Sequence, residues 1–253
     1  MFNNKKIVAV IQARLGSTRL PKKVIKPIVN KPMLFHIIER LKYSKYIDNI
    51  VVSTSTKKYD DELVGLLDKQ NITYSRGDLD DIVQRLSKAS KVNNIKYDAL
   101  VRIWGDCPCI DPTLVDKGIE QYCINRYKFL GTMENFFYPV GLNFQIWDIK
   151  ILKDIYATRD EFLYEFPQEY VKKYLNKTDF GDLYCDKDYS NIYLTVDYED
   201  DFKLIKKIFE NLYQEDRCFS WQDIIRFLDK EELTNNKLIR NIEYKEKKEK
   251  WQG

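Results

Sequence analysis

Residues Ile7–Lys23 read IVAVIQARLGSTRLPKK, and this stretch decides the fold class of the chain. An apolar run, Ile7–Ile11, leads into a short basic loop that contains Arg14, Gly16 and Lys23. A run that is apolar at every position is typical of a central parallel strand, which is buried on both faces. Backbone N–H groups and fixed cations that meet at the carboxyl end of such a strand make a phosphate site. The stretch therefore predicts an α/β protein with an anion-binding loop, although the loop is neither a Walker A sequence nor GxGxxG.

The composition predicts one large domain, or one domain with a small appendage. The chain has 253 residues, of which 44% are hydrophobic and 32% charged, and its net charge is +3. The small net charge and the lack of a long basic stripe argue against nucleic acid as a partner. No run reaches the roughly 18 apolar residues of a membrane helix, and Met1–Lys6 does not resemble a signal sequence. We therefore expect a cytoplasmic protein without a membrane anchor.

The cysteine and histidine content limits which metal sites, disulfides and catalytic mechanisms are possible. The five cysteines include no CxxC pair, which favours neither a disulfide framework nor a zinc site, so we expect reduced thiols. The only histidine, His36, falls in a predicted helix and is expected to be structural. Catalysis through a histidine triad or a histidine general base is excluded unless His36 supplies it.

Strands and helices alternate along the first half of the chain. Strands are predicted at Ile50–Thr54 and Ala99–Ile103, with helices between them at Asp60–Gln70 and Asp80–Val92. This order implies βαβ units, and hence a mostly parallel central sheet flanked by helices. The second half is less regular, but a further strand is predicted at Tyr193–Val196.

Two aspartates follow apolar strands at positions far apart in the chain. Asp106 follows the strand at 99–103, and Asp197 follows the strand at 193–196. Because the carboxyl ends of parallel strands meet at one edge, the two carboxylates could hold one or two Mg²⁺ that bridge a triphosphate. Each could instead be a helix N-cap. Asp200 or Asp201 is the more natural cap of the following helix, which leaves Asp197 for the metal.

The segment Ser75–Arg85 reads SRGDLDDIVQR. Arg76 could reach a phosphate or the edge of a base. Asp81 and Arg85 are four residues apart on a predicted helix, and this spacing favours an ion pair between them.

Four segments together resemble one enzyme family. They are ARLGSTRLPKK at 13–23, SRGD at 75–78, VRIWGDCPCIDP at 101–112 and LTVDYEDD at 194–201. The chain resembles cytidylyltransferases of the spore-coat polysaccharide type, which are related to the CMP-acylneuraminate synthetases and the 3-deoxy-manno-octulosonate cytidylyltransferases. The resemblance implies a Rossmann-like nucleotidyltransferase fold with a smaller irregular lid or dimerisation region. It also implies CTP as co-substrate, Mg²⁺ as cofactor and a homodimer.

Site residues follow from the loop chemistry and from this resemblance. The catalytic residues would be Arg14, Lys23 and Asp106, and the metal ligands Asp106 and Asp197. An acceptor pocket is expected at Asn143, Gln145, Gln168, Glu169 and Tyr170. The residues expected to bind the nucleotide are Ala13, Arg14, Gly16, Ser17, Arg19, Lys23, Arg76 and Arg102.

The chain is expected to divide into a core, an insert and a tail. Residues 1–132 and 185–236 would form the nucleotide-binding core. Residues 133–184 would form an acceptor lid or dimerisation insert, and residues 237–253 a charged tail.

The sequence departs from the family pattern at three places. The family usually has Gly where Lys22 stands, GLDVE where this chain reads GLNFQ at 141–145, and REHV where it reads QEYV at 168–171. Two carboxylates have thus become amides, Asn143 and Gln145. Their loss lowers repulsion toward an anionic acceptor, so a phosphorylated acceptor would be tolerated better.

The leading function is transfer of CMP from CTP to a small anionic acceptor, a nonulosonate-type 2-keto sugar acid, for a surface polysaccharide or glycan. One alternative keeps CTP but uses a phosphorylated or non-sugar acceptor. A non-catalytic nucleotide-binding protein is another, although the presence of both Asp106 and Asp197 argues against it. A glycosyltransferase of similar fold is a third, with Asp186 and Asp188 as a DxD motif that lies in a polar loop.

Overall fold

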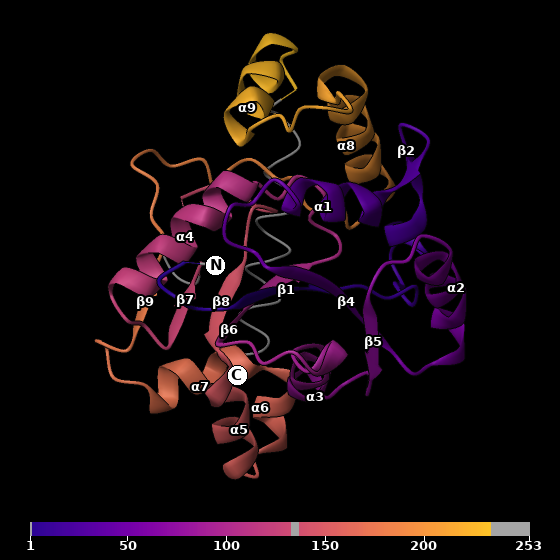
Figure 1. The fold of residues 1–253 in the computed structure, drawn as a ribbon. Helices are drawn as coiled ribbons and strands as arrows, with labels where there is room; N and C mark the ends of the chain where they lie inside the picture. The colour runs from indigo at the N-terminus through magenta and orange to yellow at the C-terminus, as the bar shows by residue number, and fades with distance from the viewer. Residues whose placement is uncertain (1, 133–136, 234–253) are drawn as a thin grey trace.

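A mostly parallel sheet forms the centre of the molecule, with helices on both faces (Figure 1). The computed structural model describes residues 2–132 and 137–233, so the predicted charged tail lies outside the described residues. Within them the sheet has seven strands in the order β5-β4-β1-β6-β8-β7-β9. The strands are β1 (Ile7–Gln12), β4 (Asn49–Ser55), β5 (Tyr74–Gly77), β6 (Ala99–Trp104), β7 (Phe129–Gly131), β8 (Gln145–Asp148) and β9 (Phe180–Asp182).

The expected parallel sheet is confirmed for the strands of the first half. β1 pairs in parallel with β4 and β6, and β4 pairs in parallel with β5. β8 runs antiparallel to β6 and β7, while β9 is parallel to β7. A short hairpin of β2 (Pro27–Ile28) and β3 (Lys31–Pro32) stands apart from this sheet.

Alternate residues of β1 pack into two separate cores. Ile7, Ala9 and Ile11 join the core on one face, whereas Val8 and Val10 join the core on the other. All five are fully buried, which explains the uninterrupted apolar run, because each face of the strand meets a layer of helices.

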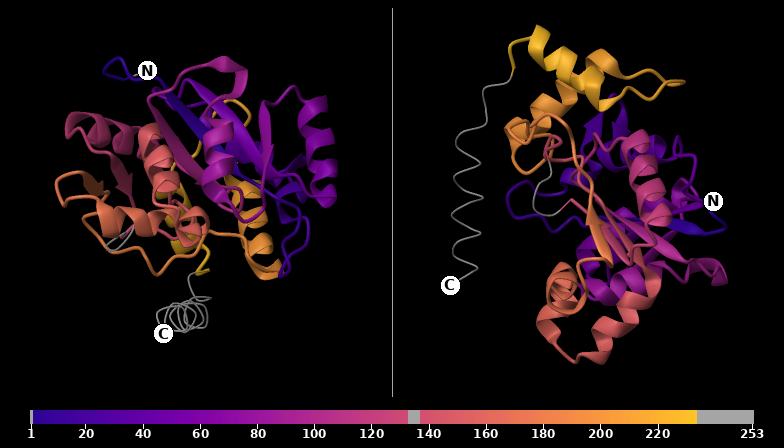
Figure 2. Two further views of the ribbon diagram at one scale, coloured as in Figure 1. Left: turned by 90° about the horizontal axis from the view of Figure 1, so that it is seen from below. Right: turned by 90° about the vertical axis from the view of Figure 1, so that its left-hand side faces the viewer.

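The two helical layers lie on opposite faces of the sheet, as the turned views show (Figure 2). The first core takes in side chains of α1 (Met33–Leu41), α2 (Asp61–Lys69), α4 (Pro112–Ile124), α8 (Glu199–Leu212) and α9 (Trp221–Lys230). The second takes in side chains of α3 (Ile82–Ala89), α5 (Ile149–Ala157), α6 (Glu161–Glu165) and α7 (Pro167–Tyr174). Three single turns of 3₁₀ helix complete the described elements, at Lys23–Ile25, Lys58–Asp60 and Val92–Asn94.

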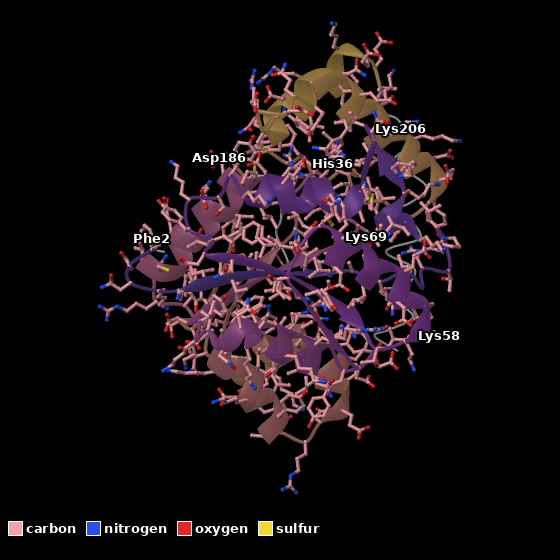
Figure 3. The ribbon with its side chains drawn as sticks, turned by 45° about the vertical axis from the view of Figure 1, so that its right-hand side comes forward. Phe2, His36, Lys58, Lys69, Asp186 and Lys206 are labelled. Carbon is pink, nitrogen blue, oxygen red and sulfur yellow. The ribbon has the colours of Figure 1, made fainter. Side chains whose placement is uncertain are left out.

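Charged side chains lie mainly on the outside. Lys58 and Lys206 stand at the periphery, whereas His36 lies inside, beneath the C-terminal helices (Figure 3). No helix in residues 2–132 and 137–233 has the length and apolar character that crossing a membrane requires.

Two sequence predictions about the segment before α8 are wrong. Tyr193–Val196 is not a strand, because only Tyr193 forms an isolated bridge, with Val140. The N-cap of α8 is Tyr198, not Asp200 or Asp201, since the chain stays extended through Tyr198. Asp201 instead sits in the first turn, where its carboxylate accepts hydrogen bonds from the backbone N–H groups of Asp197 and Tyr198.

The predicted insert, 133–184, contributes to the sheet as well as to one helical layer. β8 and β9 are strands of the central sheet, and α5 to α7 cover one of its faces. The division into core and insert stays a prediction.

Candidate active site

A cavity of about 360 Å³ opens where β1, β4 and β6 end. This is the edge at which ligands of parallel α/β sheets bind, because loops and helix N-termini diverge there. Its lining combines the basic loop, the ends of three strands, the first half of α3 with the loop before it, and one residue of α6. The lining residues are Gln12, Ala13, Arg14, Gly16, Ser17, Thr18, Arg19, Lys23, Val24, Ser53, Thr54, Ser55, Leu79, Asp80, Ile82, Arg85, Arg102, Trp104, Gly105, Asp106 and Glu165.

A buried aspartate holds the basic loop in place. Asp60 is fully buried, and its Oδ1 accepts a 2.7 Å hydrogen bond from the backbone N–H of Leu15. Its Oδ2 accepts a hydrogen bond from the hydroxyl of Ser55 at the end of β4. The basic loop also packs tightly against Tyr59, the residue before Asp60, because a Cβ added to Gly16 would lie 2.8 Å from the Tyr59 ring. Asp60 was not predicted as a site residue, because an aspartate at the start of a helix is typical of an N-cap.

Lys22 departs from the family pattern at a place where backbone geometry matters. Its φ of 58° and ψ of 21° are left-handed, a conformation that glycine adopts without strain. Its Nζ lies 2.5 Å from Glu62, and both side chains are about half exposed. The lysine at this position therefore carries backbone strain that the usual glycine would not.

Lys23 brings Asp106 and Asp197 together. It is only 7% exposed, and its Nζ donates to Asp106 Oδ2 at 2.8 Å, to the carbonyl of Val196 at 2.7 Å and to Asp197 Oδ1 at 3.2 Å. Arg19 Nη2 donates to the same Asp197 oxygen at 2.5 Å. Residues that lie more than 170 positions apart in the sequence thus form one ion-pair cluster beside the basic loop.

The cluster keeps Asp197 ionised. Burial alone would raise the pKa of the Asp197 carboxyl, but the charge of Lys23, a hydrogen bond from Tyr193 and the charge of Arg19 outweigh it and lower that pKa. The Tyr193 hydroxyl donates to Asp197 Oδ2 at 2.7 Å. A carboxylate held in this way is available to a cation or a hydrogen-bond donor throughout the neutral pH range.

The two aspartates fit a divalent cation, such as Mg²⁺, that takes its other ligands from a bound molecule. Mg²⁺ prefers carboxylate oxygens and usually takes only one or two from the protein, the rest coming from phosphates and water. Within residues 2–132 and 137–233, Asp106 Oδ1 accepts only a weak 3.7 Å contact from the thiol of Cys107. In the described part of the chain, no group of three or more His, Cys, Asp or Glu side chains could hold a metal by itself. The donor set therefore suits a shared site better than a closed protein cage.

Two buried arginines line the opposite part of the cavity. Arg102 on β6 donates through Nε to Gln12 Oε1, and through Nη1 to Gln145 Oε1 at 3.2 Å. Burial and the charge of Arg85 lower the pKa of Arg102. Arg85 was missed as a site residue.

The predicted ion pair between Asp81 and Arg85 is wrong. Arg85 Nη1 donates to the backbone carbonyls of Asp78 and Leu79. Asp81 instead caps α3 by accepting a 2.7 Å bond from the N–H of Gln84, and it accepts a 2.9 Å bond from the hydroxyl of Tyr156. The helix begins at Ile82, which places Asp81 at the cap instead of on the helix face.

Arg76 was expected to contact the nucleotide, but the structure does not bring it to the cavity. Its Nε donates to the carbonyl of Ser55 at 2.9 Å and its Nη2 to that of Lys57 at 3.1 Å. Its Nη1 lies 2.7 Å from Asp61 at the start of α2. The side chain therefore folds over the end of β4 and secures the turn into α2.

The expected acceptor residues are dispersed. Gln145 does not line the cavity itself, but it accepts a hydrogen bond from Arg102, which does. Asn143 Oδ1 accepts a 2.9 Å bond from the N–H of Gly141, a turn contact. On α7, Glu169 lies 3.6 Å from Lys172 and Tyr170 stacks on Tyr174, and neither they nor Gln168 line the cavity.

The insert reaches the cavity through Glu165, at the end of α6. This residue lies only three positions before Gln168. The sequence carried no signal for it, because its approach depends on how α6 packs against α3.

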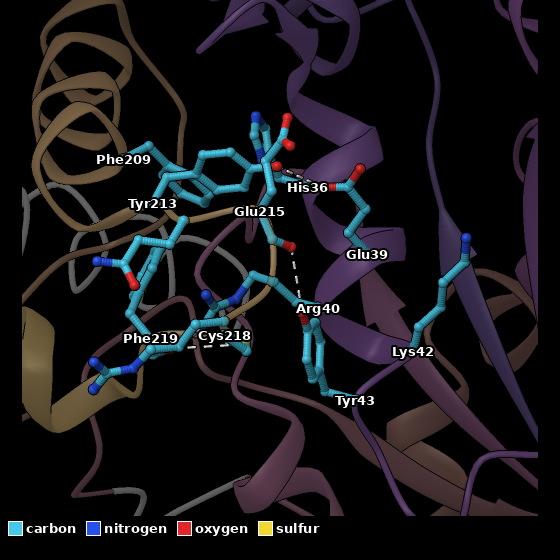
Figure 4. A pocket seen from close by; sticks show the side chains of 12 residues that line it. His36, Glu39, Arg40, Lys42, Tyr43, Phe209, Tyr213, Glu215, Cys218 and Phe219 are labelled. Atoms are coloured by element: carbon cyan, nitrogen blue, oxygen red, sulfur yellow. Dashed lines mark hydrogen bonds between the residues drawn. The ribbon is translucent and has the colours of Figure 1, made fainter.

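The single histidine lies at a second cavity, of about 300 Å³, between α1 and the chain that follows α8 (Figure 4). His36 Nε2 is 2.8 Å from the carbonyl of Ile28, and burial lowers the pKa of the ring. Nearby, Arg40 Nε donates to the carbonyl of Ile110 at 2.7 Å and Nη2 to that of Phe219 at 2.9 Å. These contacts join α1 to the C-terminal part of the chain and lie apart from the basic loop.

All five cysteines are free thiols. Cys107 and Cys109 follow β6 and are buried, and burial raises the pKa of both thiols. Neither has the low pKa of a reactive thiolate.

The fold and the ion-pair cluster beside the basic loop are those of a nucleotidyltransferase. The sequence model of one family, described as cytidylyltransferase, matches residues 8–248. The chain belongs to the cytidylyltransferase family.

Individual proteins with similar sequences are consistent with membership of the cytidylyltransferase family. An uncharacterized protein of Methanocaldococcus jannaschii is 32% identical over 96% of this chain and 100% of its own length. The spore coat polysaccharide biosynthesis protein SpsF of Bacillus subtilis is 28% identical over 81% of this chain and 86% of its own. The 3-deoxy-manno-octulosonate cytidylyltransferase of Trichlorobacter lovleyi is 29% identical over 51% of this chain and 50% of its own.

A solved structure extends the similarity over nearly the whole fold. A cytidylyltransferase from Leptospira borgpetersenii superposes with a TM-score of 0.83 and 30% identity, covering 92% of this chain and 99% of its own. The predicted family, fold class and enzyme class are thereby confirmed.

Proposed function

We propose that this enzyme transfers CMP from CTP to a hydroxyl of an acidic sugar, of the nonulosonate type, with release of pyrophosphate. The observation that carries the proposal is the cluster of Lys23, Asp106 and Asp197 directly beside the basic loop. Lys23 is 7% exposed and Asp197 is 8% exposed, and burying ionised groups is costly unless they are paired, so a cluster of this kind favours a functional role.

The basic loop binds the triphosphate in this proposal. Arg14 and Arg19 supply guanidinium forks that match phosphate oxygens, and Ser17 and the loop N–H groups add donors. All three side chains line the cavity. Gly16 allows the backbone to approach the phosphates closely.

Asp106 and Asp197 would hold Mg²⁺ together with oxygens of the bound nucleotide. When bound, Mg²⁺ would supply charge neutralisation at the phosphates and would lower the pKa of a coordinated hydroxyl. Lys23 lies between the two carboxylates and fixes their orientation through bonds of 2.8 Å and 3.2 Å. We assign it the further role of stabilising charge on the leaving pyrophosphate.

The reaction needs alignment more than covalent chemistry from the protein. The acceptor oxygen attacks the α-phosphorus, the bond to the bridging oxygen of the β-phosphate breaks, and the hydroxyl proton leaves to solvent. Positioning and electrostatic stabilisation account for most of the catalysis in such transfers. A site made of Arg, Lys and Asp meets this need, and His36 takes no part because it lies at another cavity.

The family and the relatives support CTP and a sugar acid. The family is defined by cytidylyl transfer, and the relatives named above include one enzyme named for 3-deoxy-manno-octulosonate and one protein named for polysaccharide biosynthesis. The excess of arginine in the cavity suits an anionic acceptor. Exposed aromatic side chains of the insert, Phe162 at 54% and Tyr174 at 46%, support a homodimer that forms through α6 and α7.

Pyrophosphate release tests the proposal. The enzyme is incubated with Mg²⁺, with each of CTP, UTP, GTP and ATP, and with a panel of sugar acids that includes 3-deoxy-manno-octulosonate and N-acetylneuraminate. We expect release with CTP alone, and loss of at least about a hundredfold in Asp106→Asn. Asp186→Asn is the matched control, because Asp186 is exposed and belongs to the DxD-like triplet. Full activity in Asp106→Asn, or loss in Asp186→Asn, would contradict the proposed site.

A further inference from the structure

Two buried arginines face the active-site cavity without a carboxylate partner. Arg102 is 5% exposed and Arg85 is 8% exposed, and both line the cavity. The hydrogen-bond acceptors of Arg102 are the amide oxygens of Gln12 and Gln145. Those of Arg85 are backbone carbonyls. Among the described residues every hydrogen-bond acceptor of these two guanidinium groups is therefore neutral.

Arg102 and Arg85 are two buried like charges, and their proximity is electrostatically unfavourable. Burial lowers the pKa of both side chains, and the next influence on Arg102 is the charge of Arg85, while the next on Arg85 is the charge of Arg14. Aspartates in the loop before α3 raise the pKa of Arg85, but none of them affects the pKa of Arg102. Buried charges are normally paired, because desolvation is otherwise uncompensated. Arg102 therefore has a second cation beside it and, among the residues that the structure describes, no carboxylate that acts on it, which indicates that an anion binds next to Arg102 and Arg85.

The position of the pair separates it from the cluster around Lys23. Gln12, Arg102 and Gln145 lie on three adjacent strands, β1, β6 and β8. Arg102 is two residues from Leu100, so its side chain projects on the sheet face that α3, α5 and α6 cover. Glu165 of α6 reaches the cavity on that side. Lys23 and Arg19, in contrast, are already neutralised by Asp106 and Asp197.

We propose that Arg102 and Arg85 form a subsite for a phosphate monoester on the acceptor. This rests on the proposed function, and it moves Arg102 from the nucleotide, where it was expected, to the acceptor. Two guanidinium charges are matched by a phosphate monoester, which carries close to two negative charges at neutral pH, and less well by a single carboxylate. Arginine also binds phosphate through paired N–H bonds. Gln145 keeps Arg102 available, because a glutamate there would form an ion pair with it.

The test is designed to separate this subsite from the nucleotide loop. The protein is first saturated with Mg²⁺ and the α,β-methylene analogue of CTP, which fills the loop without turnover. Inorganic phosphate and acetate are then titrated as probes by calorimetry. The variants are Arg102→Gln, which removes the cation, and Gln145→Glu, which keeps it but supplies a counter-charge. Gln70→Glu is the matched control, since Gln70 is exposed at the end of α2, outside the cavity.

We expect the wild type to bind phosphate at least about tenfold more tightly than acetate, because only phosphate matches both guanidinium groups. Both cavity variants should weaken phosphate binding by about tenfold or more, and should change the affinity for the CTP analogue by less than about twofold. Gln70→Glu should match the wild type in both.

Three results would overturn the proposal. Equal loss of analogue and phosphate binding would assign the arginines to the nucleotide. Unchanged phosphate binding in both variants would show that no subsite exists there, and equal binding of acetate would show that the subsite is not selective for phosphate. Failure of the wild type to bind the analogue would instead contradict the proposed function itself, so the two failures are distinguishable.

Discussion

The carboxylate of Asp60 accepts a 2.7 Å hydrogen bond from the backbone N–H of Leu15, and thereby ties the basic loop to the turn before α2. Asp60 is fully buried and also accepts a bond from the hydroxyl of Ser55. The loop that binds the triphosphate in our proposal is therefore positioned by a residue outside it. This arrangement gives the first prediction.

Replacing Asp60 should weaken both the fold and the nucleotide site. Asp60→Ala leaves a buried N–H and a buried hydroxyl unpaired, so we expect the free energy of unfolding to fall by about 2–3 kcal/mol. CTP binding should weaken in the same variant, while Asp60→Asn, which keeps one acceptor oxygen, should be milder. Urea unfolding and calorimetric titration with CTP measure the two effects. Asp61→Ala serves as the control, since its exposed ion pair with Arg76 contributes less than about 1 kcal/mol.

Gly105 should tolerate no side chain. A Cβ there would lie 2.7 Å from the carbonyl oxygen of Gln12, which is backbone and cannot move away cheaply. Gly105→Ala should lower stability by about 1–3 kcal/mol and displace the adjacent Asp106. Gly65→Ala is the matched control: nothing lies within 4 Å of its added Cβ, and it should stabilise α2 by about 0.5–1 kcal/mol. Thermal unfolding of the two variants should therefore shift in opposite directions.

Lys22 offers a test of backbone strain. Its left-handed φ of 58° is costly for a β-branched residue, so Lys22→Val should destabilise the protein by about 1–2 kcal/mol. Lys22→Gly should leave stability within about 0.5 kcal/mol of the wild type, because relief of strain is offset by the greater flexibility of the unfolded chain. Equal effects of the two substitutions in urea unfolding would show that the side chain, not the backbone, matters here.

The lowered pKa of Asp197 predicts the sign of a pH effect. A carboxyl whose pKa is lower in the folded state contributes stability that is present above its unfolded pKa, near about 3.9, and is lost as the pH falls through the folded value. The difference in unfolding free energy between wild type and Asp197→Asn should therefore be constant between pH 5 and 7, as ordinary titration ranges imply, and should shrink below about pH 4. The exposed Asp216→Asn should show no such trend. A difference that grows in acid would mean that the cluster does not hold Asp197 ionised.

The parallel half of the sheet could be predicted because its strands are buried on both faces. The uninterrupted apolar runs of β1, β4 and β6 exist only because two helical layers cover them. Tyr193–Val196 has similar composition but forms only one isolated bridge, since the strand pattern does not reveal whether a pairing partner is within reach.

The site could be predicted only in part, for similar reasons. A loop that follows a buried parallel strand lies at the carboxyl edge of the sheet, so the position of Arg14, Arg19 and Lys23 at the cavity could be predicted. Arg85 and Glu165 were missed, because helix spacing favoured a local ion pair for the first, and the approach of the second depends on tertiary packing.

Phosphorus NMR of the complete reaction is the sharpest test of whether the enzyme transfers CMP. CTP, Mg²⁺, the enzyme and an acceptor that supports pyrophosphate release are followed until CTP is consumed. We expect a new phosphodiester signal, from CMP joined to the acceptor, that grows in step with free pyrophosphate. Free CMP with pyrophosphate, or CDP with inorganic phosphate, would show hydrolysis instead of transfer and would refute the proposed function.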